Sequence, residues 1–300
     1  MTGWESQNFT GPGQSPGGPT VLRIVLGTRL RQLREAHGMS ADEAGRTIRA
    51  SQSKISRMEL GRIGFKERDV ADLLTLYGLT DDEQREALLS LARQANVPGW
   101  WHRYDDVLPG WFEIYIGLEE AASVIRAYDL QFIPGLLQTE EYTRAVVRLW
   151  HTDIGEDELA RRTGLRMRRQ QLLTRQSPPE FQFVIDEAAL RRPLAGQEAM
   201  RAQIRSLLDA GRLPNVTVQL VPFKAARQAA VGCAFSILQF AQHGMSDLVY
   251  LEHVTSALYM ERRADVDEYV RIMNGLSEAA LDAAATAEAL EALLDETSVI

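Results

Sequence analysis

The segment SQSKISRMELGR, residues 51–62, concentrates side chains that could recognise a nucleic acid. Ile55 and Met58 are three residues apart and would face a core together if the segment is helical, which leaves the opposite face polar. Glutamine, arginine and serine on such a face match the hydrogen-bonding groups of adenine, guanine and either base, respectively. The candidate base-reading residues are Gln52, Ser53, Ser56 and Arg57.

The residues around this face could contact a phosphate backbone. A serine at the start of the helix, together with the first-turn amides, forms a positive end that favours an anion. Lysine and arginine contacts to phosphate hold a protein on a duplex without reading its sequence. The candidate phosphate contacts are Ser51, Lys54, Arg62 and Lys66. A capped, solvent-exposed surface helix would contain the same residues, so the context has to separate the two interpretations.

The elements that must position these residues are short helices. Apolar residues at helical spacing predict a first helix that ends at His37-Gly38. Ser40, with Glu43 three residues on, has the pattern of a capping box and begins a second helix. The second helix is expected to end near Ala50, and a third to run from Gln52 to Leu60. A fourth helix is expected to end at Gly78, and a fifth to begin at Thr80. Two helices joined by a short turn allow one to lie in the major groove while the other crosses the backbone.

The charge of the chain is distributed unevenly. The formal net charge of the 300 residues is −8, yet residues 20–78 carry +4 and the remainder carries −12. A basic module joined to an acidic remainder is typical of a nucleic-acid-binding domain linked to a domain with another task.

Four segments are expected along the chain. Residues 1–19 are rich in Gly and Pro and should be disordered, and residues 20–95 should form an all-α, five-helix domain. Residues 96–117 contain three of the five Trp and should form an aromatic-rich junction. Residues 118–300 should form an α+β domain with an antiparallel sheet covered by helices.

Within the α+β domain the sequence indicates several elements. Helices are expected over Leu118–Ala127, after Thr139, over Gln197–Ala210 and from Val266 to near Glu296. The first strand is expected at Phe181–Ile185, followed by strands in NVTVQLVP, CAFSILQF, LVYLEHV and ALYME, which are rich in β-branched and aromatic residues.

The frame LRQLREAHGMSADEAGRTIRASQSKISRMELGR, residues 30–62, resembles a helix-turn-helix domain of the Cro and phage-repressor type. The resemblance implies base readers at Gln52, Ser53 and Arg57, a structural brace between Arg34 and Glu59, and close helix packing at Gly45. Two positions depart from the pattern of the family, which usually has a large apolar residue where Ala44 stands and often glycine where Arg49 stands.

The segments VIDEAALRRPLAG, LPNVTVQLVPF and VYLEHVTSALYME, with residues 99–147, resemble the C-terminal regulatory domain of actinobacterial antitoxin-like transcriptional regulators of the Scr-type, toxin-antitoxin-like family. The likeness covers roughly residues 20–275, and the Ala-rich end LDAAATAEALEALLDE departs from the shorter tail of the family. The resemblance implies that a small protein encoded by an adjacent gene is a partner.

Other kinds of site have weaker support. The five His are far apart, so no metal site is expected, and Cys233, which begins an apolar strand, suggests a buried thiol. Asp186-Glu187 and Arg191-Arg192 suggest a salt-bridged corner between a strand and a helix rather than acid–base groups. The residues that could form a partner or ligand site, or simply an interface, are Trp100, Trp101, Trp111 and Phe112.

From the sequence we expect a cytoplasmic, dimeric transcriptional regulator that binds double-stranded DNA sequence-specifically. Its C-terminal domain would serve dimerisation and receive a partner or signal. The alternative is a protein-binding antitoxin whose main role is to neutralise the small neighbouring gene product. We expect no enzyme activity, no cofactor and no membrane insertion, because no apolar segment is long enough to span a bilayer.

Overall fold

The computed structural model describes residues 18–192, 194–225, 232–241 and 245–296. The chain divides into two compact units, an N-terminal unit (Met1–Trp100) and a C-terminal unit (Trp101–Ile300). Of the segment expected to be disordered, residues 1–17 lie outside the described residues, whereas residues 18 and 19 belong to the first helix.

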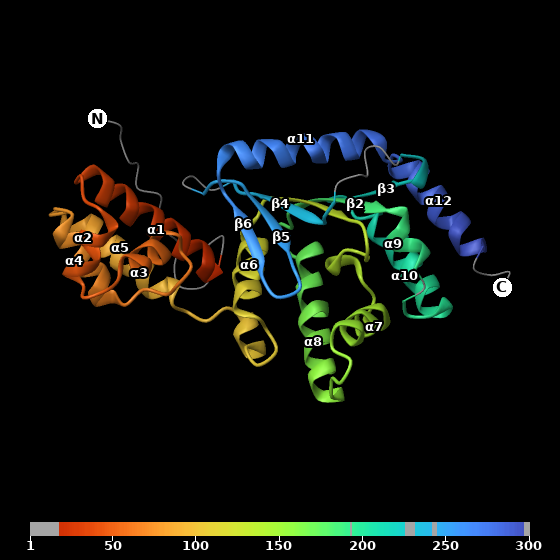
Figure 1. The fold of residues 1–300 in the computed structure, drawn as a ribbon, viewed down its shortest axis with the longest axis horizontal. Helices are drawn as coiled ribbons and strands as arrows, with labels where there is room; N and C mark the ends of the chain where they lie inside the picture. Colours follow the sequence, from red (N-terminus) through yellow and green to blue (C-terminus); the bar gives the residue numbers. More distant parts are fainter. Residues whose placement is uncertain (1–17, 193, 226–231, 242–244, 297–300) are drawn as a thin grey trace. The chain divides into compact units, whose positions relative to one another are not determined.

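The N-terminal unit is all-helical, as predicted (Figure 1). Its helices are α1 (Gly18–Ala36), α2 (Ala41–Thr47), α3 (Gln52–Glu59), α4 (Glu67–Leu76) and α5 (Asp82–Ala95). The capping box of Ser40 and Glu43 is present at the start of α2, but α2 ends earlier than the expected Ala50. Asp81 caps α5 in place of Thr80, because its carboxylate accepts a hydrogen bond from the amide of Gln84.

The five helices enclose one apolar core. Leu26 and Leu30 of α1, Ile55 and Met58 of α3, and Leu73 of α4 are all at most 1% exposed. The two residues of α3 are the pair expected to face inward. Their burial fixes the rotation of α3 about its axis and therefore fixes which side chains point to solvent.

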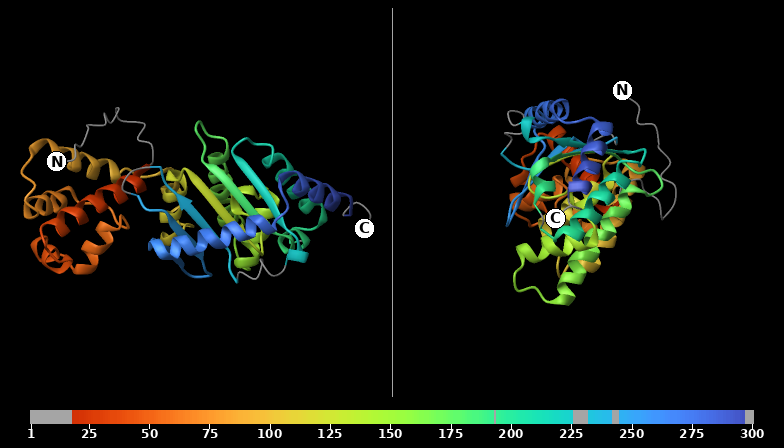
Figure 2. Two further views of the ribbon diagram at one scale, coloured as in Figure 1. Left: turned by 90° about the horizontal axis from the view of Figure 1, so that it is seen from above. Right: turned by 90° about the vertical axis from the view of Figure 1, so that its right-hand side faces the viewer.

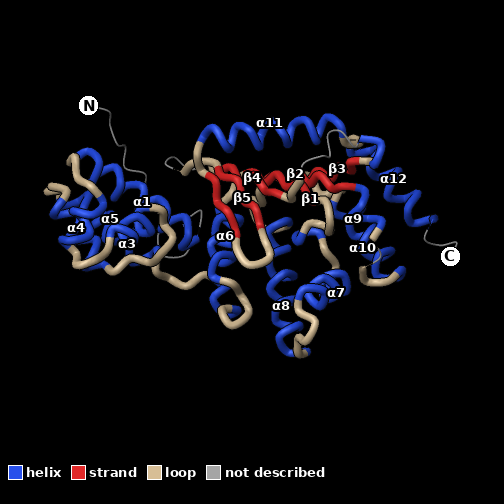
Figure 3. The backbone as a smooth tube through the Cα atoms, in the orientation of Figure 1, coloured by secondary structure: helices blue, strands red, loops and turns tan. Residues whose placement is uncertain are grey.

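The C-terminal unit combines helices with a single described sheet (Figure 3). Its α-helices are α6 (Gly110–Ala121), α7 (Glu140–Trp150), α8 (Glu156–Arg169), α9 (Glu187–Arg191), α10 (Gln197–Ala210), α11 (Arg263–Ala279) and α12 (Ala283–Glu296). Its strands are β1 (Val124–Asp129), β2 (Glu180–Asp186), β3 (Val216–Val221), β4 (Phe235–Gln239), β5 (Leu248–Glu252) and β6 (Ala257–Met260). Four short 3-10 helices, η1 (Trp100–Tyr104), η2 (Gly135–Leu137), η3 (Gln170–Leu173) and η4 (Phe223–Ala225), complete the described elements.

The sheet is mixed, and the expectation of an antiparallel sheet is wrong for two of its five strand pairs. The strand order is β3-β2-β1-β4-β5-β6. The pairs β1–β2 and β2–β3 are parallel, whereas β1–β4, β4–β5 and β5–β6 are antiparallel. The connection from β1 to β2 contains α7 and α8, and the one from β2 to β3 contains α9 and α10. Such long helical connections are what allow consecutive strands to run in the same direction.

The prediction of a helix over Leu118–Ala127 is confirmed only as far as Ala121 and is wrong from Ala122 onward. The helix there is α6, which stops at Ala121, and Ala122 has an extended backbone. The strand β1 begins two residues later, and its Ile125 is paired with Phe181 of β2 on one side and Leu238 of β4 on the other. The local sequence, which is rich in alanine and glutamate, predicts helix. The observed strand depends instead on pairing with these partners, which lie far along the chain.

Helices cover both faces of the sheet (Figures 1 and 2). Helix α11 lies across the strands on one face, where Met273 and Leu276 pack against Tyr128, Val184 and Ile237. Helices α6, α7 and α8 lie on the opposite face (Figure 1). The helical tail expected from Val266 is in fact two helices, α11 and α12, separated at Ala280. Over the described residues, no helix is both long and apolar enough to cross a bilayer.

Candidate nucleic-acid interface

The helix α3 begins and ends where its sequence indicates. The hydroxyl of Ser51 accepts a hydrogen bond from the amide of Lys54 at 3.2 Å, which satisfies one of the free N–H groups of the first turn. The helix stops at Glu59, and Gly61 follows with a φ of 64°, a conformation that favours glycine. The other first-turn amides of α3 remain available to an anion.

The four candidate base-reading residues form one exposed face of α3. The side chains of Gln52, Ser53, Ser56 and Arg57 are all exposed, and they lie opposite the buried Ile55 and Met58. The guanidinium of Arg57 makes only a long hydrogen bond, 3.4 Å from Nε to the carbonyl of Ser53, and within the described residues it has no ion pair. This side chain is therefore free to extend toward a ligand.

The candidate phosphate contacts differ in how free their charges are. Lys54 lies within 2.6 Å of the Asp69 carboxylate in the first turn of α4, with side-chain exposures of 31% and 13%. Arg62 and Lys66 are exposed, and no ion pair of either occurs in the described part of the chain. Lys54 thus connects α3 to α4 and brings less uncompensated charge to the surface than its two neighbours do.

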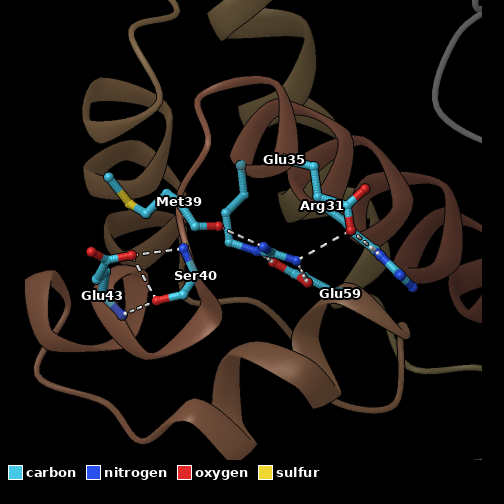
Figure 4. A network of polar contacts seen from close by, with 7 residues as sticks. Arg31, Glu35, Met39, Ser40, Glu43 and Glu59 are labelled. Atoms are coloured by element: carbon cyan, nitrogen blue, oxygen red, sulfur yellow. Dashed lines mark hydrogen bonds and ion pairs between the residues drawn. The ribbon is translucent and has the colours of Figure 1, made fainter.

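Arg34 and Glu59 form a buried, bidentate ion pair that ties α1 to the end of α3 (Figure 4). The Nε and Nη2 of Arg34 donate to the two carboxylate oxygens at 2.6 and 2.9 Å, and Nη1 donates to the carbonyl of Met39 at 2.7 Å. The side chains are 11% and 7% exposed. Hydrogen bonding to Glu59 raises the pKa of Arg34, so the pair stays charged and holds α3 in place.

Close backbone contacts fix the turn between α2 and α3. A Cβ on Gly45 would lie 2.8 Å from the carbonyl oxygen of Ala50, so the small residue is needed where α2 meets this turn. Ala44 is fully buried, and the short side chain suits the same close approach. Arg49 adopts a φ of 55°, the left-handed conformation that explains why related domains often have glycine there.

Two further residues, Gly27 and Asn96, position α3 and the segment after it. A Cβ on Gly27 of α1 would lie 2.5 and 2.6 Å from the carbonyl oxygens of Met58 and Glu59, so this glycine sets the distance between α1 and α3. Asn96 binds both backbone groups of Phe65, with its Oδ1 accepting at 3.0 Å and its Nδ2 donating at 2.5 Å. Asn96 thereby orders the segment after α3. The only sequence signal was a glycine at helical spacing in α1, and none existed for Asn96.

Two of the four aromatic candidates, Trp111 and Phe112, contact one another, with ring centroids 5.8 Å apart. Trp111 and Phe112 line a cavity in the C-terminal unit, whereas Trp101 is 2% exposed and lies against the ring of His102. Trp100 is the last residue of the N-terminal unit and is half-buried.

The remaining candidates have structural explanations. Asp186 caps α9, and Arg191 contacts Glu187 at 3.0 Å and Glu296 at 2.7 Å, which fits a salt-bridged corner. The expectation of a buried thiol at the start of a strand is wrong for Cys233, which is half-buried, precedes β4 and lines the same cavity as Phe112. The described residues contain no cluster of three or more His, Cys, Asp or Glu that could hold a metal ion.

Each of the two units matches a known domain family. Residues 112–292, more than half of the chain, match the family described as a domain of unknown function (DUF5753). The chain belongs to the DUF5753 family. Residues 25–88 match the helix-turn-helix domain, which covers α2, the turn and α3. No curated protein and no solved structure matches significantly. The helix-turn-helix match and the exposed face of α3 identify this DUF5753 protein as a DNA-binding regulator, and they leave the activity of the DUF5753 region itself undefined.

Proposed function

We propose that this protein is a sequence-specific transcriptional regulator that places α3 in the major groove of double-stranded DNA. The observation that carries the proposal is the polar face of α3, in which Gln52, Ser53, Ser56 and Arg57 are exposed while Ile55 and Met58 are buried. Arg57 would pair with guanine and Gln52 with adenine. Arg62, Lys66 and the first turn of α3 would contact phosphates.

The proposal includes dimerisation. One α3 helix of eight residues can reach few base pairs, so a single copy would discriminate weakly between sites. Two copies that bind half-sites about 34 Å apart would combine their contacts and their specificity. The DUF5753 unit is our candidate for dimerisation and for receiving a partner or signal, because the helix-turn-helix match ends at residue 88.

An antitoxin-like role is the second candidate. It rests on the sequence resemblance and on charge, since the residues outside 20–78 carry a formal charge of −12. This charge would attract a small basic protein and speed its association. Co-purification with the product of an adjacent small gene, and a change of DNA affinity when that product is added, would support the role. Unchanged DNA affinity would separate partner binding from regulation.

The decisive experiment for DNA binding is selection of bound duplexes from a random pool by the full-length protein, followed by the same selection with Arg57→Ala. The wild-type protein should enrich a pseudo-palindromic site, and the variant should lose preference at one position in each half-site. An unchanged preference in the variant would remove Arg57 from the base-reading set. Selection of no sequence at all by the wild-type protein would contradict specific recognition.

A further inference from the structure

A cavity of about 660 Å³ lies in the C-terminal unit between the sheet and helices α6, α7 and α8. Its volume falls in the range of roughly 300–1,000 Å³ that is common for small-molecule sites. Its lining includes Asp129, the last residue of β1, and the residues that follow it. The strand β1 lies between a parallel and an antiparallel neighbour. Ligands of open α/β sheets often bind at such carboxyl ends of strands. The aromatic part of the wall includes Trp111, Phe112, Tyr115, Phe132, Trp150 and Tyr250.

One face of α8 supplies three arginines to this cavity, Arg162, Arg166 and Arg169. Two of them have carboxylate partners: Arg162 contacts Glu158 at 2.7 Å, and Arg169 makes a bidentate contact with Glu119 at 2.7 and 2.9 Å. Arg166 differs, because its Nη1 donates to the amide oxygen of Gln138 at 2.8 Å and no carboxylate of the described residues lies within 4.0 Å. It is a half-buried cation without a counter-ion in contact.

The guanidinium groups of Arg166 and Arg169 converge beside Gly135. A Cβ on this glycine would lie 3.9 Å from Nε of Arg166 and 3.7 Å from Nη1 of Arg169. That Nη1 is the one terminal nitrogen of Arg169 that does not contact Glu119, and among the described residues it has no hydrogen-bond partner. The Arg169 guanidinium also stacks over Phe112 at 4.8 Å. The cavity therefore places two cationic donors next to its aromatic wall.

The acids of the cavity offset the charge of these cations only in part. Burial raises the pKa of Asp129 to about 7, with Glu252 adding repulsion. Burial also raises the pKa of Glu252, although the attraction of Arg169 and Arg166 opposes that rise. A carboxylate with a raised pKa can become neutral by taking up a proton. A guanidinium keeps its proton at physiological pH, so Arg166 stays charged and can bind an anion that enters the cavity.

We infer that this cavity binds an amphipathic organic acid, whose carboxylate contacts Arg166 and Nη1 of Arg169 and whose apolar, ring-sized body packs against Trp111 and Phe112. Paired guanidinium donors suit the two oxygens of a carboxylate, and charge-assisted hydrogen bonds are among the stronger ones in proteins. The site belongs to the DUF5753 region and goes beyond the proposed DNA recognition. It would stand even if α3 bound no specific sequence.

The test uses three probes that share one ring system and differ in charge: 2-naphthylacetate, 2-naphthylacetamide and 2-(2-naphthyl)ethylamine. Their affinities for the full-length protein are measured by isothermal titration calorimetry. The acid should bind about 10-fold more tightly than the amide or the amine, which is the size of one charge-assisted hydrogen bond. Arg166→Gln should remove this preference and leave the affinity for the amide unchanged, and Arg166→Lys should retain part of it.

Arg168→Gln is the matched control. Arg168 is exposed on the same helix and does not line the cavity, so its loss should not alter the affinity for the acid. Equal affinities of the three probes, a preference for the amine, or no binding of the acid up to millimolar concentration would overturn the inference. An equal loss of acid and amide binding in Arg166→Gln would also overturn it, because the arginine would then only support the shape of the cavity.

Discussion

The two units each contain a buried, bidentate arginine–glutamate pair, and the pairs differ in one nitrogen. In the N-terminal unit, each of the three guanidinium nitrogens of Arg34 donates a hydrogen bond within the unit, two to Glu59 and one to the carbonyl of Met39. In the C-terminal unit, Arg169 binds Glu119 through Nε and Nη2, and Nη1 faces the cavity. The Arg34–Glu59 pair uses all three nitrogens and holds α3 in place, whereas the Arg169–Glu119 pair leaves Nη1 of Arg169 available to a ligand.

The comparison extends to the arginines near each pair. Arg57 is exposed on α3. Water and salt screen its charge there, so its attraction to a polyanion such as DNA depends on the salt concentration. Arg166 is half-buried, and burial together with Arg169 lowers its pKa to about 10. An exposed guanidinium is suited to a large ligand that arrives from solvent, and an enclosed one is suited to a single small anion.

The largest expected effect comes from breaking the two buried pairs. Glu59→Gln and Glu119→Gln should each lower the free energy of unfolding by about 3 kcal/mol, because each leaves a buried arginine without its carboxylate. Only Glu119→Gln should be rescued by 2-naphthylacetate, which can offer a carboxylate to Arg169. Thermal unfolding with and without the acid, with the amide as the control, distinguishes the pairs. Rescue of both variants, or of neither, would remove the difference between them.

The second effect concerns Arg57. Arg57→Ala should weaken binding to the preferred duplex by about 1–3 kcal/mol and should affect unrelated duplexes much less, because a bidentate contact to guanine is lost. Fluorescence anisotropy with the selected duplex and with one scrambled duplex measures both affinities. Arg46→Ala is a suitable control, since Arg46 is exposed on α2 and already pairs with Asp42 at 2.5 Å. Equal losses on both duplexes would make Arg57 a phosphate contact.

A smaller effect separates the free and the paired surface cations. Arg62→Gln should reduce the slope of log K against log salt by about 1, as expected for one lost phosphate contact. Lys54→Gln should reduce it less, because Asp69 already compensates Lys54. Salt titrations of the wild-type protein and both variants on one nonspecific duplex provide the slopes. If the slope fell more for Lys54→Gln than for Arg62→Gln, DNA would have to displace Asp69 from the lysine.

The smallest effect is the pH dependence of the cavity. Asp129 has a pKa of about 7, so it is mostly neutral at pH 6 and mostly ionised at pH 8. Ionisation adds a negative charge to the cavity, close to Glu252 of β5 and Tyr142 of α7, and the affinity for 2-naphthylacetate should fall severalfold as the pH rises. Calorimetry at both pH values checks this, and Asp129→Asn should flatten the dependence. Asp157→Asn, on the exposed first turn of α8, should retain it.

Local chemistry made much of the N-terminal unit predictable. The hydroxyls of Ser40 and Ser51 cap their helices as the sequence suggests, and the inward positions of Ile55 and Met58 follow from helical spacing alone. The ion pair between Lys54 and Asp69 was not predictable in this way, because it depends on the packing of α4 against α3. Short-range signals thus place a helix and its exposed face, and tertiary contacts decide which charges stay free.

The C-terminal unit was less predictable because its organisation depends on distant partners. The sequence predicts helix for the first four residues of β1, since the β character of this strand comes from pairing with β2 and β4 rather than from its own residues. The cavity brings together Asp129, Arg166 and Glu252, which belong to three elements separated by long stretches of chain. No spacing in the sequence links them. Helical connections between β1 and β2 would have been the best available clue to the parallel pairing.

The turn between α2 and α3 is not optimised for stability alone. Arg49 occupies a left-handed conformation that costs a residue with a Cβ about 1 kcal/mol relative to glycine. The same side chain is exposed immediately before the helix that we propose reads DNA. Replacing it with glycine should therefore stabilise the unit while removing one positive charge from the approach to the duplex. At this position, a positive charge beside the proposed DNA-reading helix coincides with a less stable turn.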